Sequence, residues 1–553
     1  MVWRLRWTIG VQVLGWGLLG CQREAPPPAG VFRIGLFAPY TSLDPLYARD
    51  QISAWLVQQL FAGLVGYDSL LRPIPSLATR WEISPDARVY RFYLRKGVTF
   101  HGRPFRRLRA SDVVYSWHRL ASPKWASPGA YLFRGLIRGW KDFQEGKTPT
   151  IAGLRALSDS VLEVELEAPY GPFLHLLTLP YAMVVLPEAA ESLGRAFGRQ
   201  PVGCGPFQLE WQEPGRLLVF RRHEPAPAPF VQKLVFRWFP NRLWAWEALK
   251  RGEIDAFEGQ DRALEYLFRS DSTWRRWAVR IETPQLGTEY LGMDGRPGRP
   301  LADPGVRRAL RAVIWRLPLV EQLLGGHATP ARSFVPPPLL AYLPRCDTTL
   351  ADTLLQKLQG LRLTLYAQPA FRELCDYLEL HLRSYGVDLR IEYLLGPSLR
   401  EFISKGQVAF WKASWLADYP DGENFLLLFE SSQWVPQGPN TTRFAHRLLD
   451  SLLQAARRSV SDSVRRTLYA QAESLLSQEV PVIPLYHGHG IWQVSRRWAG
   501  FPCSPLPVWL PLGQVRYLGL QELPEGFPAQ LLPVQKQGRA INPRRKVPSP
   551  SGG

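Results

Sequence analysis

About 500 residues stand between two segments that are poorly suited to packing, and this length constrains the fold more than any other feature of the chain. The first segment, residues 22–30 (QREAPPPAG), is a proline-rich tether. The second, residues 534–553, is rich in proline, glycine and serine, and we expect it to be disordered. The body between them exceeds one ordinary hydrophobic core, so the sequence predicts two or three domains.

Residues 1–21 have the pattern of a secretory signal. Arg4 and Arg6 form a short positive start, and residues 9–19 are apolar apart from Gln12. This apolar run is shorter than the length that a helix needs to span a bilayer. We therefore expect an exported protein whose working part begins near Val31.

The signal closes with Leu18-Leu19-Gly20-Cys21, which resembles the lipobox of bacterial lipoproteins. The resemblance implies that Cys21 takes the lipid, becomes the new N-terminus and holds the body at a membrane surface through the tether, residues 22–31. An uncleaved N-terminal anchor is the alternative. No other run in the sequence is long and apolar enough to span a membrane.

The formal charge of +19 raises the question of nucleic-acid binding. Several of the basic residues lie in the signal and in the C-terminal tail, which has no acidic residue. Elsewhere, basic residues are dispersed among carboxylates, as on a solvated surface rather than along a phosphate track. We expect no nucleic-acid partner.

Alternation of apolar and polar residues predicts half-buried strands at 89–94, 161–166 and 217–220. Between the first two, Ser111 is the predicted polar N-cap of a helix whose apolar stripe reaches Trp117.

A clearer unit lies further along the chain. Residues 361–366 and 387–393 alternate as strands, and apolar residues recur at helical spacing between them. This order predicts a parallel pair joined by a right-handed crossover. Leucine stripes at 444–457 and 463–478 predict two more helices that face the core. The sequence thus predicts an α/β protein with mixed sheets in more than one lobe.

The chain carries no signature of an enzyme: it has no glycine-rich phosphate loop, no G-x-S-x-G and no H-E-x-x-H. We therefore expect no catalytic residue and no cofactor. His487 and His489 are the densest histidine pair, but two imidazoles alone make an incomplete metal shell. An ordinary polar loop is the favoured interpretation, and we expect no metal site.

Besides Cys21, the chain has four cysteines: Cys204, Cys346, Cys375 and Cys503. Their spacing matches no metal pattern and does not fix a pairing. One or two disulfides, as in many exported proteins, and buried free thiols both remain open.

The most informative segment is residues 413–421 (ASWLADYPD). Asp418 lies between aromatic residues in a stretch that ends at a proline turn. Such an aspartate suits the role of counter-charge for a cation that enters a partly desolvated pocket. A turn-capping aspartate is an equally good interpretation on chemistry alone.

From about residue 32 to 520 the chain resembles the large extracytoplasmic solute-binding proteins of dipeptide and oligopeptide ABC importers (family 5). Each matching segment is weak alone, but they occur in the family's order over hundreds of residues. The segments are residues 42–45, 59–65, 77–86, 90–101, 110–116, 201–207, 252–256 and 303–310.

The resemblance implies a two-lobed periplasmic-binding-protein fold (type II, cluster C-like) with mixed sheets flanked by helices and an extra insertion domain. Two connecting strands form the hinge. The implied division is lobe 1 at 32–48, 169–272 and 488–530, an insertion domain at 49–168, lobe 2 at 273–487 and a basic tail at 531–553.

In peptide-binding members, the aspartate of the Trp-x-Ala-Asp-Tyr segment pairs with the α-ammonium group of the ligand. This implies the same role for Asp418, with Trp415, Ala417 and Tyr419 around it. Tyr486 falls where the family often supplies another pocket tyrosine.

The implied protein is a monomer. It closes on a peptide and hands it to a permease and an ATPase. A nickel chelate or an oligosaccharide as ligand, and a receptor or chaperone that binds peptides without import, are the alternatives. Departures from the family pattern, such as Cys204 in place of threonine, put the subfamily in doubt.

Overall fold

The computed structural model describes residues 30–102, 106–223, 230–259, 262–340, 352–436 and 438–518. The predicted signal with Cys21, nearly all of the tether, Cys346 and the predicted tail lie outside these ranges.

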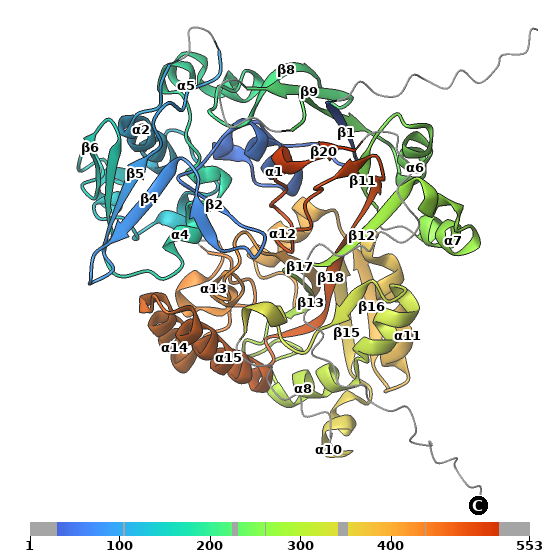
Figure 1. Ribbon diagram of the computed structural model, residues 1–553. Coiled ribbons are helices and arrows are strands. Elements are labelled where there is room, and N and C mark those ends of the chain that lie inside the picture. The colour runs from blue at the N-terminus through green and yellow to red at the C-terminus, as the bar shows by residue number, and fades with distance from the viewer. Residues whose placement is uncertain are drawn as a thin grey trace, which may run out of the picture.

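A mixed sheet of twelve strands runs through the whole body (Figure 1). Ten strands follow one another in pairing order, and two more pair with β18, the longest of them. The order is β16 (Asp388–Tyr393), β15 (Arg362–Ala367), β17 (Phe410–Leu416), β13 (Gly287–Met293), β18 (Val482–Ser495), β11 (Ala256–Glu258), β1 (Val31–Leu36), β10 (Lys233–Trp238), β9 (Leu217–Arg222) and β8 (Phe207–Glu213), with β12 (Ala278–Pro284) and β14 (Ala328–Pro330) beside β18.

β18 is long enough to belong to both lobes of this sheet. The first half of β18 pairs with β13, and its last residues pair with β11. β12 runs antiparallel beside the second half, from Ala278 opposite Ser495 to Pro284 opposite His489. β12 and β18 therefore form a two-stranded ribbon that crosses from one lobe to the other (Figure 1).

Lobe 1 packs helices against β1, β8, β9, β10 and β11. Its core joins strand residues such as Phe32 and Phe236 to Trp55 and Leu56 of the first helix, all nearly inaccessible to solvent. The crossover helix between β10 and β11 ends at Gly252, whose φ of 78° favours glycine as the terminator. The helices are α5 (Pro187–Leu193), α6 (Arg242–Arg251) and α7 (Arg262–Ser270), together with α1 (Gln51–Leu60), which packs on this core although it falls within the predicted insertion domain at 49–168.

Lobe 2 contains the predicted strand–helix–strand unit. β15 and β16 pair in parallel, from Arg362 opposite Asp388 to Ala367 opposite Tyr393, which confirms the predicted parallel pair. The leucine stripes are also helical, and their buried faces share one core. The helices are α8 (Pro304–Val313), α11 (Arg372–Arg383), α12 (Gly396–Ser404), α14 (Arg447–Arg458) and α15 (Asp462–Glu479).

A separate four-stranded antiparallel sheet stands at the edge of lobe 1, with α2 (Ala110–Ala121) packed on it (Figure 1). The predicted N-cap of this helix is wrong: the helix begins at Ala110, and Asp112 closes its first turn by accepting a hydrogen bond from the Arg109 amide at 2.7 Å. The strands are β4 (Ala78–Ile83), β5 (Val89–Leu94), β7 (Val161–Glu165) and β6 (Leu154–Ser158), which confirms the strands predicted near 89 and 161.

The short elements link these units. They are β2 (Val65–Tyr67), β3 (Pro73–Pro75), α3 (Trp140–Gln144), α4 (Phe173–Leu176), α9 (Arg316–Pro318), α10 (Asp352–Leu355), α13 (Glu423–Leu426), β19 (Trp498–Ala499) and β20 (Arg516–Tyr517). Near α4, the Gly171 amide donates to the Arg457 carbonyl at 2.7 Å, and the Tyr170 hydroxyl donates to Glu423. Lobe 2 is thus in direct contact with the region of the four-stranded sheet.

Candidate functional site

Asp418 comes directly after β17, where the chain leaves the central part of the lobe 2 sheet. Its carboxylate acts electrostatically on Tyr131 and Tyr181, because its negative charge adds to the effect of burial in raising the pKa of both hydroxyls. These tyrosines belong to short helical turns that pack with the four-stranded sheet and α2. Asp418 of lobe 2 therefore faces residues of the opposite part of the molecule.

Asn424 holds the Asp418 segment in place. Its side-chain oxygen accepts hydrogen bonds from the Asp418 amide at 3.1 Å and from the Trp415 indole N–H at 3.3 Å. Its Nδ2 reaches Asp418 Oδ2 at 3.5 Å. Asn424 is fully buried in α13. It organises two of the predicted site residues, yet nothing in its sequence context distinguishes it from other asparagines.

The neighbouring acidic side chains, Asp421 and Glu423, each have an arginine partner. Asp421 accepts hydrogen bonds from Arg465 Nε at 3.1 Å and from the Tyr469 hydroxyl at 2.6 Å. Glu423 forms an ion pair with Arg457 at 2.5 Å. Both carboxylates are thus buried with an arginine partner, as buried charges normally are.

Asp418 differs from both, because none of the cations in the described part of the chain forms an ion pair with it. Its side chain is partly buried, and this desolvation raises the pKa of its carboxyl to about 6, against the lowering effect of the hydrogen bond from Asn424. A carboxylate in such surroundings gains a large electrostatic benefit from any cation that reaches it.

The other predicted site residues are divided between two faces of the sheet. Ala417 is buried, and Trp415 is partly buried against the core formed with α14 and α15. Tyr419 is buried among the residues of the four-stranded sheet region, and its hydroxyl donates to Glu423 at 3.2 Å. The structure therefore places the segment that contains Trp415, Asp418 and Tyr419 at the contact between the two parts of the molecule.

Tyr486 lies on β18 in the same cross-strand row as Glu289 and Ser414. Because side chains alternate along a strand, this row projects from the opposite face to Trp415. Burial, together with the charge of Glu289, raises the pKa of Tyr486. Glu289 accepts a hydrogen bond from Ser414 at 2.6 Å and pairs with the buried Lys412, a network that the sequence did not indicate.

The matches to known proteins agree with this geometry. The sequence model of the bacterial extracellular solute-binding proteins, family 5 Middle, matches residues 72–437, which is more than half of the chain. The chain belongs to family 5 of the bacterial extracellular solute-binding proteins.

Relatives of this solute-binding protein match along most of its length. The dipeptide-binding protein of Escherichia coli (strain K12) is 25% identical over 535 residues, which cover 90% of this chain and 94% of the relative. A probable di/tripeptide-binding protein of Pseudomonas aeruginosa (strain UCBPP-PA14) is 27% identical over 458 residues and covers 78% and 85%. The Escherichia coli murein tripeptide binding protein MppA has the same fold, with a TM-score of 0.75 at 24% identity over 89% of this chain and 99% of that one.

The loop predicted at residues 487–489 of this solute-binding protein is wrong, because both histidines belong to β18. They are two residues apart on this strand, so they project from the same face. His487 is buried, with its Nδ1 3.0 Å from both the Thr288 hydroxyl and the Gly287 carbonyl. His489 lies between Glu282 and Thr329. The described ranges contain no group of three or more side chains arranged to hold a metal ion.

Cys204, Cys375 and Cys503 carry free thiols. Burial raises the pKa of the first to about 12 and of the second to about 11, so both behave as inert core residues. Cys204, the departure from the family pattern, packs in the core of the four-stranded sheet region.

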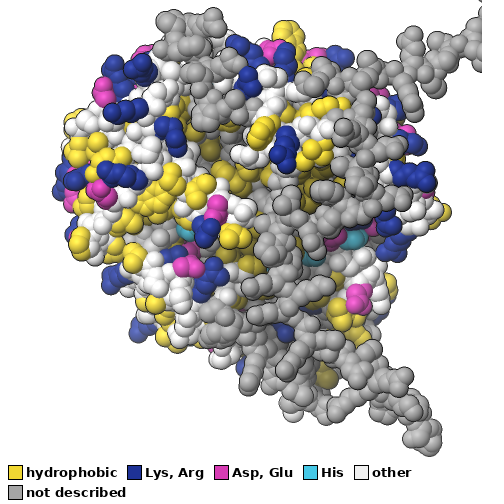
Figure 2. All heavy atoms as spheres, viewed as in Figure 1, with side chains coloured by type: hydrophobic (Ala, Val, Ile, Leu, Met, Phe, Trp, Pro, Cys, Tyr) yellow, Lys and Arg dark blue, Asp and Glu magenta, His cyan; other side chains and the backbone are white. Residues whose placement is uncertain are grey.

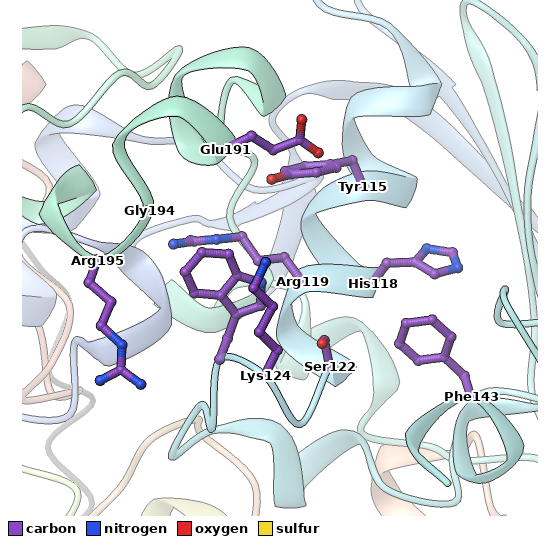
Figure 3. A pocket seen from close by; sticks show the side chains of 10 residues that line it. Tyr115, His118, Arg119, Ser122, Lys124, Phe143, Glu191, Gly194 and Arg195 are labelled. Atoms are coloured by element: carbon purple, nitrogen blue, oxygen red, sulfur yellow. The ribbon is translucent and has the colours of Figure 1, made fainter. Parts of the chain in front are cut away.

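A cavity of about 680 Å³ lies apart from Asp418, between α2 and α5 (Figure 3). Tyr115 and Glu191 lie side by side at one end of it, and Arg119 projects from α2 near Lys124. Arg119 is already neutralised by Asp44, with Nη–Oδ distances of 2.7 and 2.9 Å. None of the predicted site residues lines this cavity.

Lysine and arginine side chains are scattered over the face shown in Figure 2, with acidic side chains between them, and the described residues on that face form no continuous basic track. None of the helices in the described segments is both long and apolar enough to cross a bilayer.

Proposed function

We propose that this solute-binding protein captures peptides with a free N-terminus between its lobes and delivers them to the permease and ATPase of an ABC importer. The observation that carries this proposal is Asp418 itself, which is partly buried at the contact between lobe 2 and the rest of the molecule and has no ion-pair partner among the described residues. The names of the dipeptide- and di/tripeptide-binding relatives support a peptide ligand. Binding without catalysis agrees with the absence of an enzyme motif in the sequence.

The chemistry of a peptide N-terminus fits Asp418. An α-ammonium group has a pKa of about 7.7 to 8.0, so it is mostly charged at neutral pH. Asp418, with a pKa of about 6, is mostly ionised there. The pair would form in partly desolvated surroundings, where losing one partner costs about 2 to 5 kcal/mol, or roughly thirty- to several-thousand-fold in affinity.

We also propose that Cys21 carries a lipid and that the body works outside the cytoplasm at a membrane surface. The lipobox-like residues 18–21 and the proline-rich residues 22–30 support this. The division into lobe 1 (32–48, 169–272 and 488–530), an insertion domain (49–168) and lobe 2 (273–487) is part of the same proposal. The β12–β18 ribbon supports it, because it connects the two parts of the sheet.

Calorimetry tests the peptide assignment. Wild type is titrated with trialanine, with a pool of short peptides and with their Nα-acetylated forms. We expect binding of the free-amine peptides, and at least thirty-fold weaker binding of the acetylated ones and of any peptide to Asp418→Asn.

Asp462→Asn is the matched control. It removes the same charge from an exposed position on α15, where Asp462 pairs with Arg466 at 2.7 Å. This variant should bind like wild type. Equal affinity of Asp418→Asn and wild type for a free-amine peptide would remove Asp418 from the site.

A further inference from the structure

A cluster of ionisable side chains spans the β12–β18 ribbon, outside the segment that carries Asp418. It joins three parts of the molecule. Glu265 comes from α7 in lobe 1, Arg280 and Glu282 from β12, His489 from β18, and His327 from the residues before β14 in lobe 2. All five side chains are mostly buried, with exposed fractions between 14% and 31%.

His327 occupies the centre of this cluster. Its Nε2 is 3.1 Å from Glu265 Oε2, and its Nδ1 is 3.1 Å from Glu282 Oε1. Arg280 Nη2 lies 3.1 Å from His327 Nε2 and 2.7 Å from Glu265 Oε1. The exposed Arg269 of α7 is a further charged group near this turn, beside Gly325.

The donors and acceptors around His327 allow two arrangements. An ionised carboxylate only accepts hydrogen bonds, and a neutral imidazole has one N–H. In the neutral form, Nδ1–H donates to Glu282, and Nε2 accepts from Arg280. In the protonated form, Nε2–H donates to Glu265 instead. Protonation therefore changes the hydrogen-bond partner of Nε2 from Arg280 of β12 to Glu265 of lobe 1.

The carboxylates of this cluster outnumber its guanidinium groups. With both histidines neutral, Glu265 and Glu282 face one guanidinium, that of Arg280, so the cluster carries one net negative charge. Hydrogen bonds from His489 and His327 lower the pKa of Glu282 to about 2, so this carboxylate stays ionised at any pH at which the protein works. His489 Nδ1 is 2.7 Å from Glu282, and its Nε2 is 3.0 Å from the Thr329 hydroxyl, which donates or accepts.

The bond between Glu265 and His327 connects the lobes directly. Glu265 moves with lobe 1 and His327 with lobe 2, and the ribbon between them is the pivot for any rotation of one lobe against the other. In this structure the lobes are also in contact through the Gly171 amide and the Arg457 carbonyl. A stronger Glu265–His327 bond therefore stabilises the arrangement in which the lobes touch.

We propose that His327, with Glu265 and Glu282, forms a proton-operated latch at the hinge: protonation of His327 ties the two lobes together, and deprotonation releases them. Acidification then shifts the ligand-free protein toward the closed arrangement, and neutral or alkaline pH favours opening. A charge-assisted hydrogen bond of this kind should change the closed-to-open ratio roughly five- to tenfold.

Small-angle X-ray scattering of the ligand-free protein between pH 5 and pH 8 tests the latch. We expect wild type to become more compact as the pH falls, with the closed-to-open ratio rising roughly five- to tenfold. His327→Gln should show less than a twofold change. Its amide nitrogen can still donate to Glu282 and its oxygen can accept from Arg280, but it gains no charge.

His446→Gln is the matched control, because His446 stands at the start of α14, stacks on Phe444 and lies apart from the ribbon. It should respond to pH as wild type does. Asp418 is present in every variant, so its own titration is common to all of them. The latch is refuted if His327→Gln responds like wild type, or if wild type keeps one compactness throughout the pH range.

A second measurement couples the latch to binding. The ratio of the trialanine dissociation constants of His327→Gln and wild type should rise from about one at pH 8 to roughly five at pH 5.5. A ratio that stays at one contradicts the latch. If trialanine binds to no variant, the peptide assignment fails, and the scattering experiment still decides the latch.

Discussion

Replacing Asp418 by asparagine should stabilise the ligand-free protein while removing its proposed ligand anchor. The ionised carboxylate is partly buried and has no cationic partner in the described ranges, and its pKa rises from 3.8 to about 6 on folding. Two pKa units correspond to about 3 kcal/mol of unfavourable free energy for the charged form. Because solvent still reaches part of the side chain, we expect a net gain of about 1 to 3 kcal/mol from Asp418→Asn.

The destabilisation of the fold by the Asp418 carboxylate depends on pH. Below the unfolded pKa of 3.8, Asp418 is protonated in both states and costs nothing. As the pH rises to about 6, the unfolded chain ionises first, so the carboxylate progressively destabilises the fold. Above that pH the cost is constant. The advantage of Asp418→Asn should therefore be small at pH 4 and complete at pH 7.5.

Urea-induced unfolding followed by circular dichroism at pH 4, 6 and 7.5 measures this difference. Asp421→Asn is the control with the opposite sign. It removes the buried partner of Arg465 at 3.1 Å and leaves only the exposed Asp462 at 3.2 Å, which should cost about 3 kcal/mol. An Asp418→Asn variant that is no more stable than wild type at pH 7.5, or whose gain is the same at all three pH values, would refute the argument.

Two further predictions concern binding and location. In the His327→Gln background, which removes the latch, affinity for trialanine should be highest near pH 7; it should fall up to tenfold per unit below about pH 6, as Asp418 gains a proton, and above about pH 8, as the peptide amine loses one. Calorimetry across this range checks it, and a flat acidic limb would contradict the assigned pKa of Asp418. Cys21→Ser should move the protein from the membrane fraction to the soluble fraction of cells and abolish incorporation of labelled fatty acid; retention in membranes would contradict lipid attachment.

Local patterns predicted the strands and helices well where each element has one buried face. The alternation at 362–367 and 388–393 and the stripe between them are properties of neighbouring residues, and the structure confirms the parallel pair. The ends of helices and strands were harder to predict from the sequence. Ser111 looked like an N-cap, but the Asp112 carboxylate closes the turn at Arg109, which moves the start of α2 to Ala110.

The sequence also misassigned His487 and His489, because glycine between two histidines is typical of a loop. The strand is imposed by pairing with β12, β13 and β14, whose paired residues are between 156 and 217 positions away. The distant pairs also give each histidine its partners, Thr288 for one and Glu282 for the other. No local pattern contains this information.

The sequence by itself determined the family, the strand and helix content and the choice of Asp418 as the proposed ligand anchor, because these depend on residue types and their order along the chain. Only the tertiary structure decided that Asp421 and Glu423 have arginine partners while Asp418 has none in the described chain. The same holds for the cluster around His327, whose members come from α7, β12, β18 and the residues before β14. The reason is that ion pairs and desolvation depend on distances between side chains that are remote in sequence, which folding alone sets.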